Sequence, residues 1–308
     1  PTPPTDDAPE PMPDWTLADL RIHDGITGAR VDPDALRRRL ARADVVLLGE
    51  QHDDARGHAA QRAIVRAAVR HHGSDAALAL EMLERDEQAL VDDFRDGLID
   101  ETTFVRRTFS ANWAGPDTWA AWYQPIIDVV LDAGGPVIAA NAPRRYVRHA
   151  NRAGYDALRT LDPDRRRLFV LPNRSPSDDY RARFDEIMSG GGIHAGPGLD
   201  DLYNSQLVWD ATVADSVLRA IDRPDIRQVL LLIGQFHTDF NGGTTAFIRE
   251  RRPDLDVLTV STRREPAATL LPEDRGRADF IIYTTPVAPP APPTAPATRP
   301  TTQPDDAR

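Results

Sequence analysis

Six short apolar runs constrain the fold of this chain more than any other feature of its sequence. Each run has the length of a buried strand, and amphipathic helical patterns at 55–72 and 118–134 separate the early ones. Alternating strands and helices predict an α/β fold, with a mostly parallel β-sheet flanked by helices. The predicted strands are residues 44–50, 76–82, 136–142, 228–234, 256–262 and 280–285.

Two connections are longer than a simple crossover between parallel strands requires. Residues 84–117 and 144–200 both carry further helical patterns. We expect these insertions to build a smaller helical cap domain beside the sheet. The alternative is ordinary surface decoration of the main domain.

Both ends of the chain are rich in proline and poor in large apolar residues. Residues 1–16 are proline- and acid-rich, and residues 286–308 are rich in proline, threonine and alanine. Such segments bury too little surface to offset their ordering entropy, so both are predicted to be disordered. The first is either a spacer that tethers the domain at 17–285 or an inert leftover.

The composition narrows the classes of partner and cofactor. The chain has 308 residues and a net charge of −11, which argues against nucleic acid and against electrostatic docking on anionic lipid. It has no cysteine, so any metal or iron must be held by other side chains. No apolar stretch reaches the roughly 20 residues of a spanning helix. Because the sequence starts at Pro1, we expect that a signal peptide or lipid anchor upstream was removed.

Polar residues stand where four of the predicted strands end. In a parallel sheet the carboxyl ends of the strands share one edge, where ligands bind. Burying these side chains is costly unless they share a ligand or pair with each other. We therefore predict a site at this edge, and its residues are Glu50, His52, Glu81, Asn141, Arg144 and His237.

Two of these strand ends share the pattern glycine–x–x–histidine. Gly49 precedes His52, and Gly234 precedes His237. Two imidazoles with Glu50 and Glu81 suit a divalent metal such as Mn, Zn or Fe, and an imidazole also suits an axial position on haem. One such motif alone arises by chance, and a lone histidine at a strand end usually caps it. The joint pattern over four strands carries the prediction.

Three more residues are candidates for the same site. His58 follows His52 by one short stretch and is expected either at the site or elsewhere on its helix. Gln206 and Asp210 lie four residues apart on the helical pattern at 202–221, so they share one face. Asp210 is expected either to orient a histidine through a hydrogen bond or to pair with an arginine.

Five blocks of this sequence resemble those of the ChaN-like haem-binding uptake family. That family belongs to the wider Tiki, TraB and erythromycin-esterase-like superfamily, and the resemblance covers roughly residues 17–262. The blocks occur in the family's order and approximate spacing. They are LLGEQHDDARGHAAQ, LEMLERDEQALVDDFRDG, IAANAPRRYVRHANRAG, SQLVWDATVADSV and IGQFHTDFNGGT.

The resemblance implies a haem- or iron-binding protein of the bacterial cell envelope. Members of the family are often lipoproteins on the periplasmic side, take part in haem or iron uptake, and can form homodimers around haem. Tyr123 matches a family aromatic position, where a phenolate can ligate haem iron, although packing is its commoner role. The chain departs from many relatives at Phe236, which replaces a small residue beside the site.

Three functions remain open on the sequence. The first is haem binding, with His52, His237, Glu50 and Glu81 as candidate ligands. The second is a metal-dependent hydrolase, a protease or esterase, in which Glu50, Glu81, Asn141 and Arg144 are catalytic. The third is a scaffold that kept the fold and lost its ligand.

Overall fold

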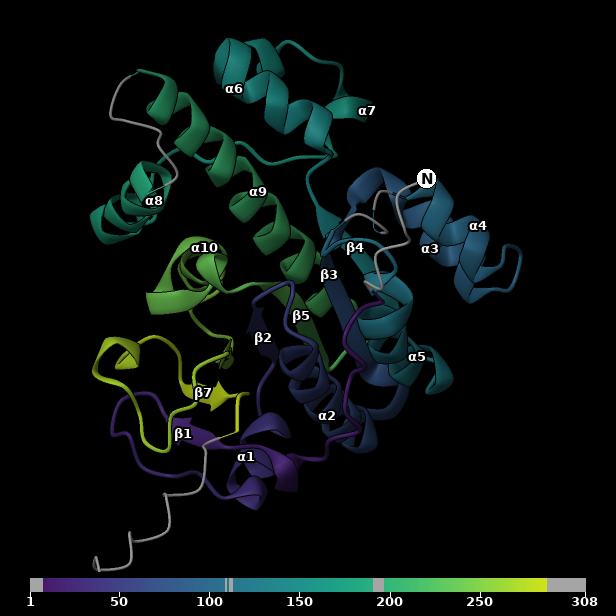
Figure 1. The fold of residues 1–308 in the computed structure, drawn as a ribbon. Helices are drawn as coiled ribbons and strands as arrows, with labels where there is room; N and C mark the ends of the chain where they lie inside the picture. The colour runs from purple at the N-terminus through teal and green to yellow at the C-terminus, as the bar shows by residue number, and fades with distance from the viewer. Residues whose placement is uncertain (1–7, 109, 111–112, 191–196, 287–308) are drawn as a thin grey trace, which may run out of the picture.

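A seven-stranded sheet forms the centre of the computed structural model, which describes residues 8–108, 110, 113–190 and 197–286. The strand order is β1-β7-β6-β2-β5-β3-β4, and every neighbouring pair is parallel except β1 with β7 (Figure 1). The predicted α/β fold is therefore confirmed. The strands are β1 (Ile22–Asp24), β2 (Val45–Glu50), β3 (Ala76–Glu84), β4 (Val137–Asn141), β5 (Gln228–Gly234), β6 (Val257–Arg263) and β7 (Phe280–Tyr283).

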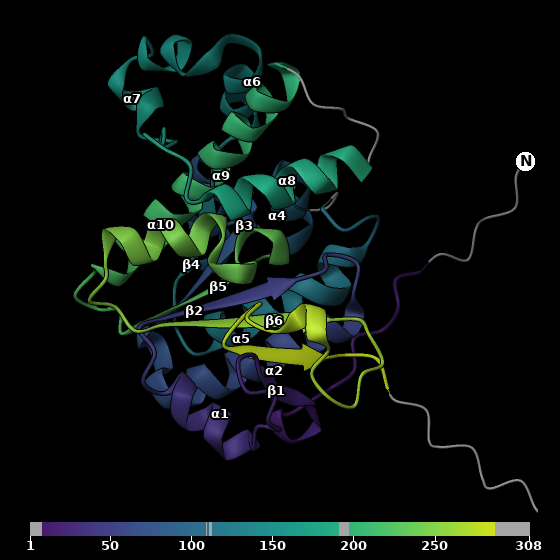
Figure 2. The ribbon, with the colours of Figure 1, turned by 90° about the vertical axis from the view of Figure 1, so that its left-hand side faces the viewer.

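Helices cover both faces of the sheet (Figure 2). Helices α1, α2 and α5 lie on one face, and α9 and α10 lie on the other. In the described part of the chain, no helix is both long and apolar enough to cross a membrane. The helices are α1 (Pro33–Leu40), α2 (Ala55–His72), α3 (Gln88–Arg95), α4 (Glu101–Arg107), α5 (Gln124–Asp132), α6 (Arg144–Arg159), α7 (Pro163–Arg166), α8 (Asp178–Gly190), α9 (Pro197–Ile221) and α10 (Gly243–Arg251).

The central strands are apolar along their length because both of their faces are buried. In β2, Val46 and Leu48 pack into the core beneath the sheet, while Val45 and Leu47 pack into the core under α9 and α10. Successive side chains of a strand point to opposite faces, so a continuous apolar run is what two covering layers require. The length of each buried run therefore determines where that strand ends at the edge of the sheet.

All six predicted strands are present, but β1, α1 and α10 were not predicted. Strand β1 is three residues long and pairs antiparallel with β7 at the edge of the sheet. Helix α1 begins after the N-cap Asp32. The helix predicted at 118–134 is in fact a π-helical turn, Trp119–Tyr123, followed by α5.

The two predicted insertions occupy different places. Helices α6 and α7 lie beyond the sheet beside the first half of α9, and they enclose a small core of their own with Tyr146, Phe169 and Val208 (Figure 1). Helices α3 and α4 instead contribute Val91 and Phe104 to the main core. Helices α6 and α7 of the second insertion therefore lie beyond the sheet, whereas α3 and α4 of the first insertion belong to its core.

The N-terminal segment differs from the predicted disordered spacer over its described part. The backbone carbonyl of Glu10 accepts a hydrogen bond from the Trp122 indole at 2.8 Å. Asp14 accepts from Arg62 at 2.9 Å and from Arg66 at 2.5 Å, so residues 8–16 are held against α2. Residues 1–7 and the tail at 287–308 lie outside the described residues.

Candidate functional site

Three strand ends that lie side by side bring the predicted site together. Strand β5 lies between β2 and β3, and Glu50 pairs with Gly234 in the register of β2 and β5. The Gly234 N–H donates to Glu81 of β3 at 2.7 Å. His52 and His237 follow β2 and β5 directly. Four of the six predicted rim residues therefore meet here: Glu50, His52, Glu81 and His237.

Glu50 is fully buried and accepts hydrogen bonds from three side chains. His52 Nδ1 and the Tyr123 hydroxyl each lie 2.8 Å from Oε1, and the Gln61 amide lies 2.7 Å from Oε2. Burial alone would raise the pKa of Glu50, but the charge of His58 and the His52 hydrogen bond outweigh it and lower the pKa to about 2. Glu50 is therefore an ionised carboxylate.

The side chains of His58 and Tyr123 support Glu50 and do not face a ligand. Both are completely buried. The two ring nitrogens of His58 lie 3.0 Å from the Gln61 side-chain oxygen and from the His52 carbonyl. His58 Nδ1 is 3.7 Å from Glu50, so the ring is held close to the carboxylate. The predicted haem-ligating role of Tyr123 has no support in this geometry.

His52 is oriented by Glu50 and keeps its second nitrogen free. Its Nδ1 lies 2.8 Å from Glu50 and 3.2 Å from the indole N–H of Trp113, whose ring meets the imidazole edge-on at 5.7 Å. Burial alone would lower the pKa of His52, but Glu50 raises it. Its Nε2 has no hydrogen-bond partner among the described residues, and its side chain is 36% exposed. A Cβ at Gly234 would lie only 3.1 Å from this Nε2, so a glycine lets the imidazole lie over the strand end.

His237 is held between two buried carboxylates. Its Nδ1 lies 2.7 Å from Asp210, and its Nε2 lies 3.3 Å from Glu81. Burial alone would lower the pKa of His237, but the two carboxylates raise it to about 10. His237 is therefore an imidazolium that donates from both nitrogens, and Gln206 lies 3.2 Å from its Nδ1.

Asp210 is itself fixed from three sides. The Tyr180 hydroxyl donates to it at 2.6 Å and the Thr244 hydroxyl at 2.9 Å, in addition to His237. Gly243 has a φ of +41°, and a Cβ there would lie 2.4 Å from the Asp210 carboxylate. Of the two expectations for Asp210, the structure shows the contact with histidine. Phe236 does not enter the site, because it stacks on Tyr180 at 4.9 Å.

Asn141 and Arg144 do not contact the two rim histidines, although Arg144 lines the cleft at the rim. The Asn141 amide donates to the Glu81 backbone carbonyl, and its oxygen accepts from the Ala142 N–H, each at 2.8 Å. Asn141 is buried and fully used in shaping the end of β4, so the predicted catalytic role of its amide is not supported. The Arg144 guanidinium lies over the Trp113 ring at 4.4 Å and 3.8 Å from Glu84.

A cleft of about 310 Å³ opens at this rim. Sequence reasoning missed three of its lining residues, Trp113, Arg148 and Trp209, because they lie on a connecting loop and on helices rather than at strand ends. A helical face shared with Arg144 was the one signal for Arg148. The cleft is lined by Glu81, Trp113, Arg144, Arg148, Trp209 and His237.

The predicted divalent-metal site is not supported. Over the described residues, no group of three or more histidine and acidic side chains is arranged to hold a metal ion. The physical reason is that both carboxylates nearest the histidines already accept short hydrogen bonds, and His237 carries its own proton. The histidines and carboxylates compensate one another's charge and leave no open set of ligands.

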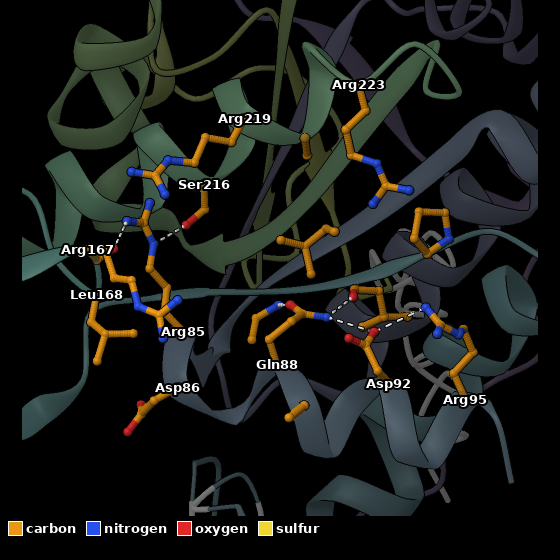
Figure 3. Close-up of a pocket in the computed structure, with 16 residues that line it drawn as sticks. Arg85, Asp86, Gln88, Asp92, Arg95, Arg167, Leu168, Ser216, Arg219 and Arg223 are labelled. Carbon is orange, nitrogen blue, oxygen red and sulfur yellow. Dashed lines mark hydrogen bonds and ion pairs between the residues drawn. The ribbon is translucent and has the colours of Figure 1, made fainter. Parts of the chain in front are cut away.

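A larger cavity of about 670 Å³ lies away from this rim, along the edge strand β4 (Figure 3). Its guanidinium groups are largely engaged within the protein. Arg85 and Arg219 bind Asp215, Arg95 binds Asp92, and Arg223 binds a neighbouring aspartate. It contains none of the predicted site residues, so the rim cleft remains the candidate site.

Comparison with known proteins gives one family and two informative structures. A cofacial haem complex of ChaN from Campylobacter jejuni is 21% identical, with a TM-score of 0.66, over 88% of this chain and 99% of that one. The type III effector HopBA1 is 11% identical, with a TM-score of 0.51, over 88% and 98%. At these identities the likeness shows the fold alone.

A search of curated proteins finds no match to this sequence. The family model described as haem-binding uptake, Tiki superfamily, ChaN matches residues 36–248. That match covers well over half of the chain, including both glycine–x–x–histidine segments. The chain therefore belongs to the ChaN family of haem-binding uptake proteins within the Tiki superfamily.

Proposed function

We propose that this protein binds haem at the rim cleft and that His52 holds the iron. One observation carries the assignment: of the two rim histidines, His52 alone has a ring nitrogen without a partner among the described residues. Because the buried Glu50 carboxylate can only accept from Nδ1, the neutral ring of His52 carries its lone pair on Nε2. A carboxylate behind a histidine is the usual way to orient an iron- or metal-binding imidazole.

The other candidate ligands fit haem iron less well. His237 is protonated on both nitrogens between Asp210 and Glu81, and an imidazolium has no lone pair to give. Tyr123 is buried, and burial with the nearby Glu50 charge raises the pKa of its hydroxyl well above the ordinary value, so no phenolate forms. When bound, haem would supply an iron centre that takes one imidazole as axial ligand.

A hemin titration followed in the Soret region tests this proposal. Wild-type protein is expected to give a saturable, shifted Soret band with one hemin per chain. His52→Ala is expected to lose that band or shift it, whereas His71→Ala, at the far end of α2, should behave as wild type. A wild-type titration without a saturable band, or an unchanged band in His52→Ala, contradicts the assignment.

Uptake of haem or iron at the cell envelope is the role that we propose for this binding. It is supported by the description of the family. Periplasmic or lipid-anchored location is tested by fractionating cells that make the full-length gene product. A homodimer around haem is tested by sedimentation with and without hemin, which should show a hemin-dependent increase in mass.

A hydrolase without a metal is the second candidate function. The observation that favours it is the pair of carboxylate-held histidines beside Glu81. His52 Nε2 would take a proton from water while the water oxygen attacks an ester carbonyl carbon, and the His237 imidazolium would stabilise the developing oxyanion. Turnover of a p-nitrophenyl ester that is lost in His52→Ala supports this function. Equal rates for wild type and variant reject it.

A further inference from the structure

An apolar slot of about 420 Å³ adjoins the rim cleft. It lies between α6, α8 and α9, and Gln206 is the one residue of its lining that the sequence analysis names as a site candidate. Ligand sites of this kind are mostly apolar, with a few polar groups that fix orientation. The apolar side chains lining the slot are Val147, Phe184, Met188, Leu202 and Trp209.

The slot and the cleft form one continuous surface. Arg148 and Trp209 line both cavities. The indole N–H of Trp209 is buried and has no acceptor among the described residues, so a donor stands unused at the boundary between them. A ligand held by iron in the cleft therefore has an apolar space of about 420 Å³ beside it.

Two arginines at the border of the slot have no partner. Arg148 and Arg152 lie one helical turn apart on α6, and both line the slot. Among the described residues, neither guanidinium forms a hydrogen bond or an ion pair. Their neighbours on the same helix differ: Arg145 binds Asp86 at 2.6 Å, and Arg144 lies over Trp113.

Arg148 and Arg152 differ from the other arginines without a partner because they border an apolar slot. The net charge is −11, and most arginines of the described chain bind a carboxylate. An anionic ligand approaching this protein is repelled by the molecule as a whole, so it needs local positive charge where it binds. Arg148 and Arg152 supply two such charges beside an apolar surface. Their planar guanidinium groups match carboxylates well.

We propose that Arg148 and Arg152 recognise the two carboxylates of an amphiphilic diacid whose apolar body occupies the slot. This inference rests on the proposed function, because haem is such a ligand: a porphyrin body that carries two propionate groups. It adds residues that select the ligand by its acid groups, independently of the iron ligand. The apolar side chains of the slot contact the apolar body of the ligand. The two arginines determine which edge of the ligand faces outward.

Hemin and its dimethyl ester separate the two contributions. The ester keeps the iron and the porphyrin but lacks both acid groups. Each is titrated against wild type, Arg148→Gln/Arg152→Gln, and a control double variant, Arg145→Gln/Arg159→Gln, which removes the same charge from the same helix. The slot variant is the double variant Arg148→Gln/Arg152→Gln. Because it loses two exposed charge pairs with the ligand, it is expected to bind hemin about tenfold more weakly than wild type. Its Soret maximum stays that of wild type, and the control variant keeps wild-type affinity.

The ester provides the decisive comparison. We expect wild type to bind the ester about tenfold more weakly than hemin, and the slot variant to bind both ligands equally. Equal hemin affinity in wild type and slot variant overturns the arginine assignment while haem binding stands. An equal loss in the control variant also overturns it, because the effect is then general charge. If wild type shows no saturable Soret band, the proposed function fails and this inference falls with it.

Discussion

At the residue scale, the site depends on pairing buried carboxylates with buried histidines. Glu50, Glu81 and Asp210 are all buried, and each lies beside a histidine of the set His52, His58 and His237. A buried charge is tolerated only when a partner and hydrogen bonds replace water. This pairing explains how polar residues stand at the ends of core strands, and it leaves His52 Nε2 as the free group.

Replacing Glu50 with glutamine should destabilise the protein markedly. Three donors converge on its two oxygens, so the amide of glutamine would point an N–H₂ group at another donor. Breaking a buried pair in this way costs about 3 kcal/mol of unfolding free energy. Urea denaturation of Glu50→Gln measures the loss. Glu186→Gln, at an exposed position that forms no hydrogen bond or ion pair within the described chain, is the control and should match wild type.

The contribution of Glu50 should vanish in acid. Its pKa is lowered in the folded protein from 4.5 to about 2, so its contribution to stability is complete above about pH 4.5 and is lost as the pH falls toward 2. The difference in unfolding free energy between wild type and Glu50→Gln should therefore be constant near neutral pH and shrink below pH 4.5. A difference that grows in acid would contradict the assigned charge.

The sequence predicted which residues gather at the rim better than what each residue does. Glu50, His52, Glu81 and His237 are adjacent because each directly follows or ends an apolar run, and that signal is local. Asn141 gives the same local signal, yet its amide is used by backbone groups. The roles of His58 and Tyr123 depend on contacts with segments far away in the sequence, which no local pattern reports.

At the scale of elements, an amide side chain protects the open edge of the sheet. Strand β4 has no neighbouring strand on its outer side in the described sheet. There the Gln88 side chain donates to the Val137 carbonyl at 3.0 Å and accepts from the Ala139 N–H at 2.8 Å (Figure 3). This single amide reproduces the two hydrogen bonds of a neighbouring strand. Unprotected edges otherwise promote pairing between molecules.

Replacing Gln88 with alanine should therefore destabilise the protein and expose the edge of β4. The loss of two hydrogen bonds to buried backbone groups costs about 2 kcal/mol. Denaturation measures the stability, and light scattering at high concentration measures self-association, which should increase. Asp93→Ala on the same helix is the matched control. Unchanged stability in Gln88→Ala would show that water replaces the amide without cost.

Strands and helices with long sequence patterns were easier to predict than short ones. The six apolar runs are buried on both faces and carry a strong signal, so the corresponding strands are all present. Strand β1 has three residues, too few for any periodicity to show. The π-helical turn at Trp119–Tyr123 was missed because residue type does not distinguish it from an α-helix, and tertiary contacts such as Tyr123 with Glu50 decide it.

At the scale of the whole molecule, the crossovers bring distant segments to one rim. The strand order places β2, β5 and β3 side by side, although nearly 150 residues separate β3 from β5 in sequence, as the numbering shows. Helices α6 and α8 border the apolar slot, and α6 also borders the cleft. Sequence reasoning predicted a shared edge, but the cavity between cap and sheet depends on how α6, α8 and α9 pack.

Hemin should stabilise the whole molecule if it binds the folded state alone. At a free concentration 100 times the dissociation constant, the expected gain is about 2.7 kcal/mol of unfolding free energy. Urea denaturation with and without hemin measures it. The same concentration should stabilise His52→Ala much less than wild type. Equal stabilisation of both proteins would place the binding elsewhere.

The location of bound iron tests the central claim most directly. Crystals of the hemin complex, measured at the iron absorption edge, give an anomalous difference map that shows iron alone. We predict one peak within bonding distance of His52 Nε2, beside Glu81 and His237. A peak bonded to any other residue, or none at the rim in protein that holds hemin in solution, would contradict the account.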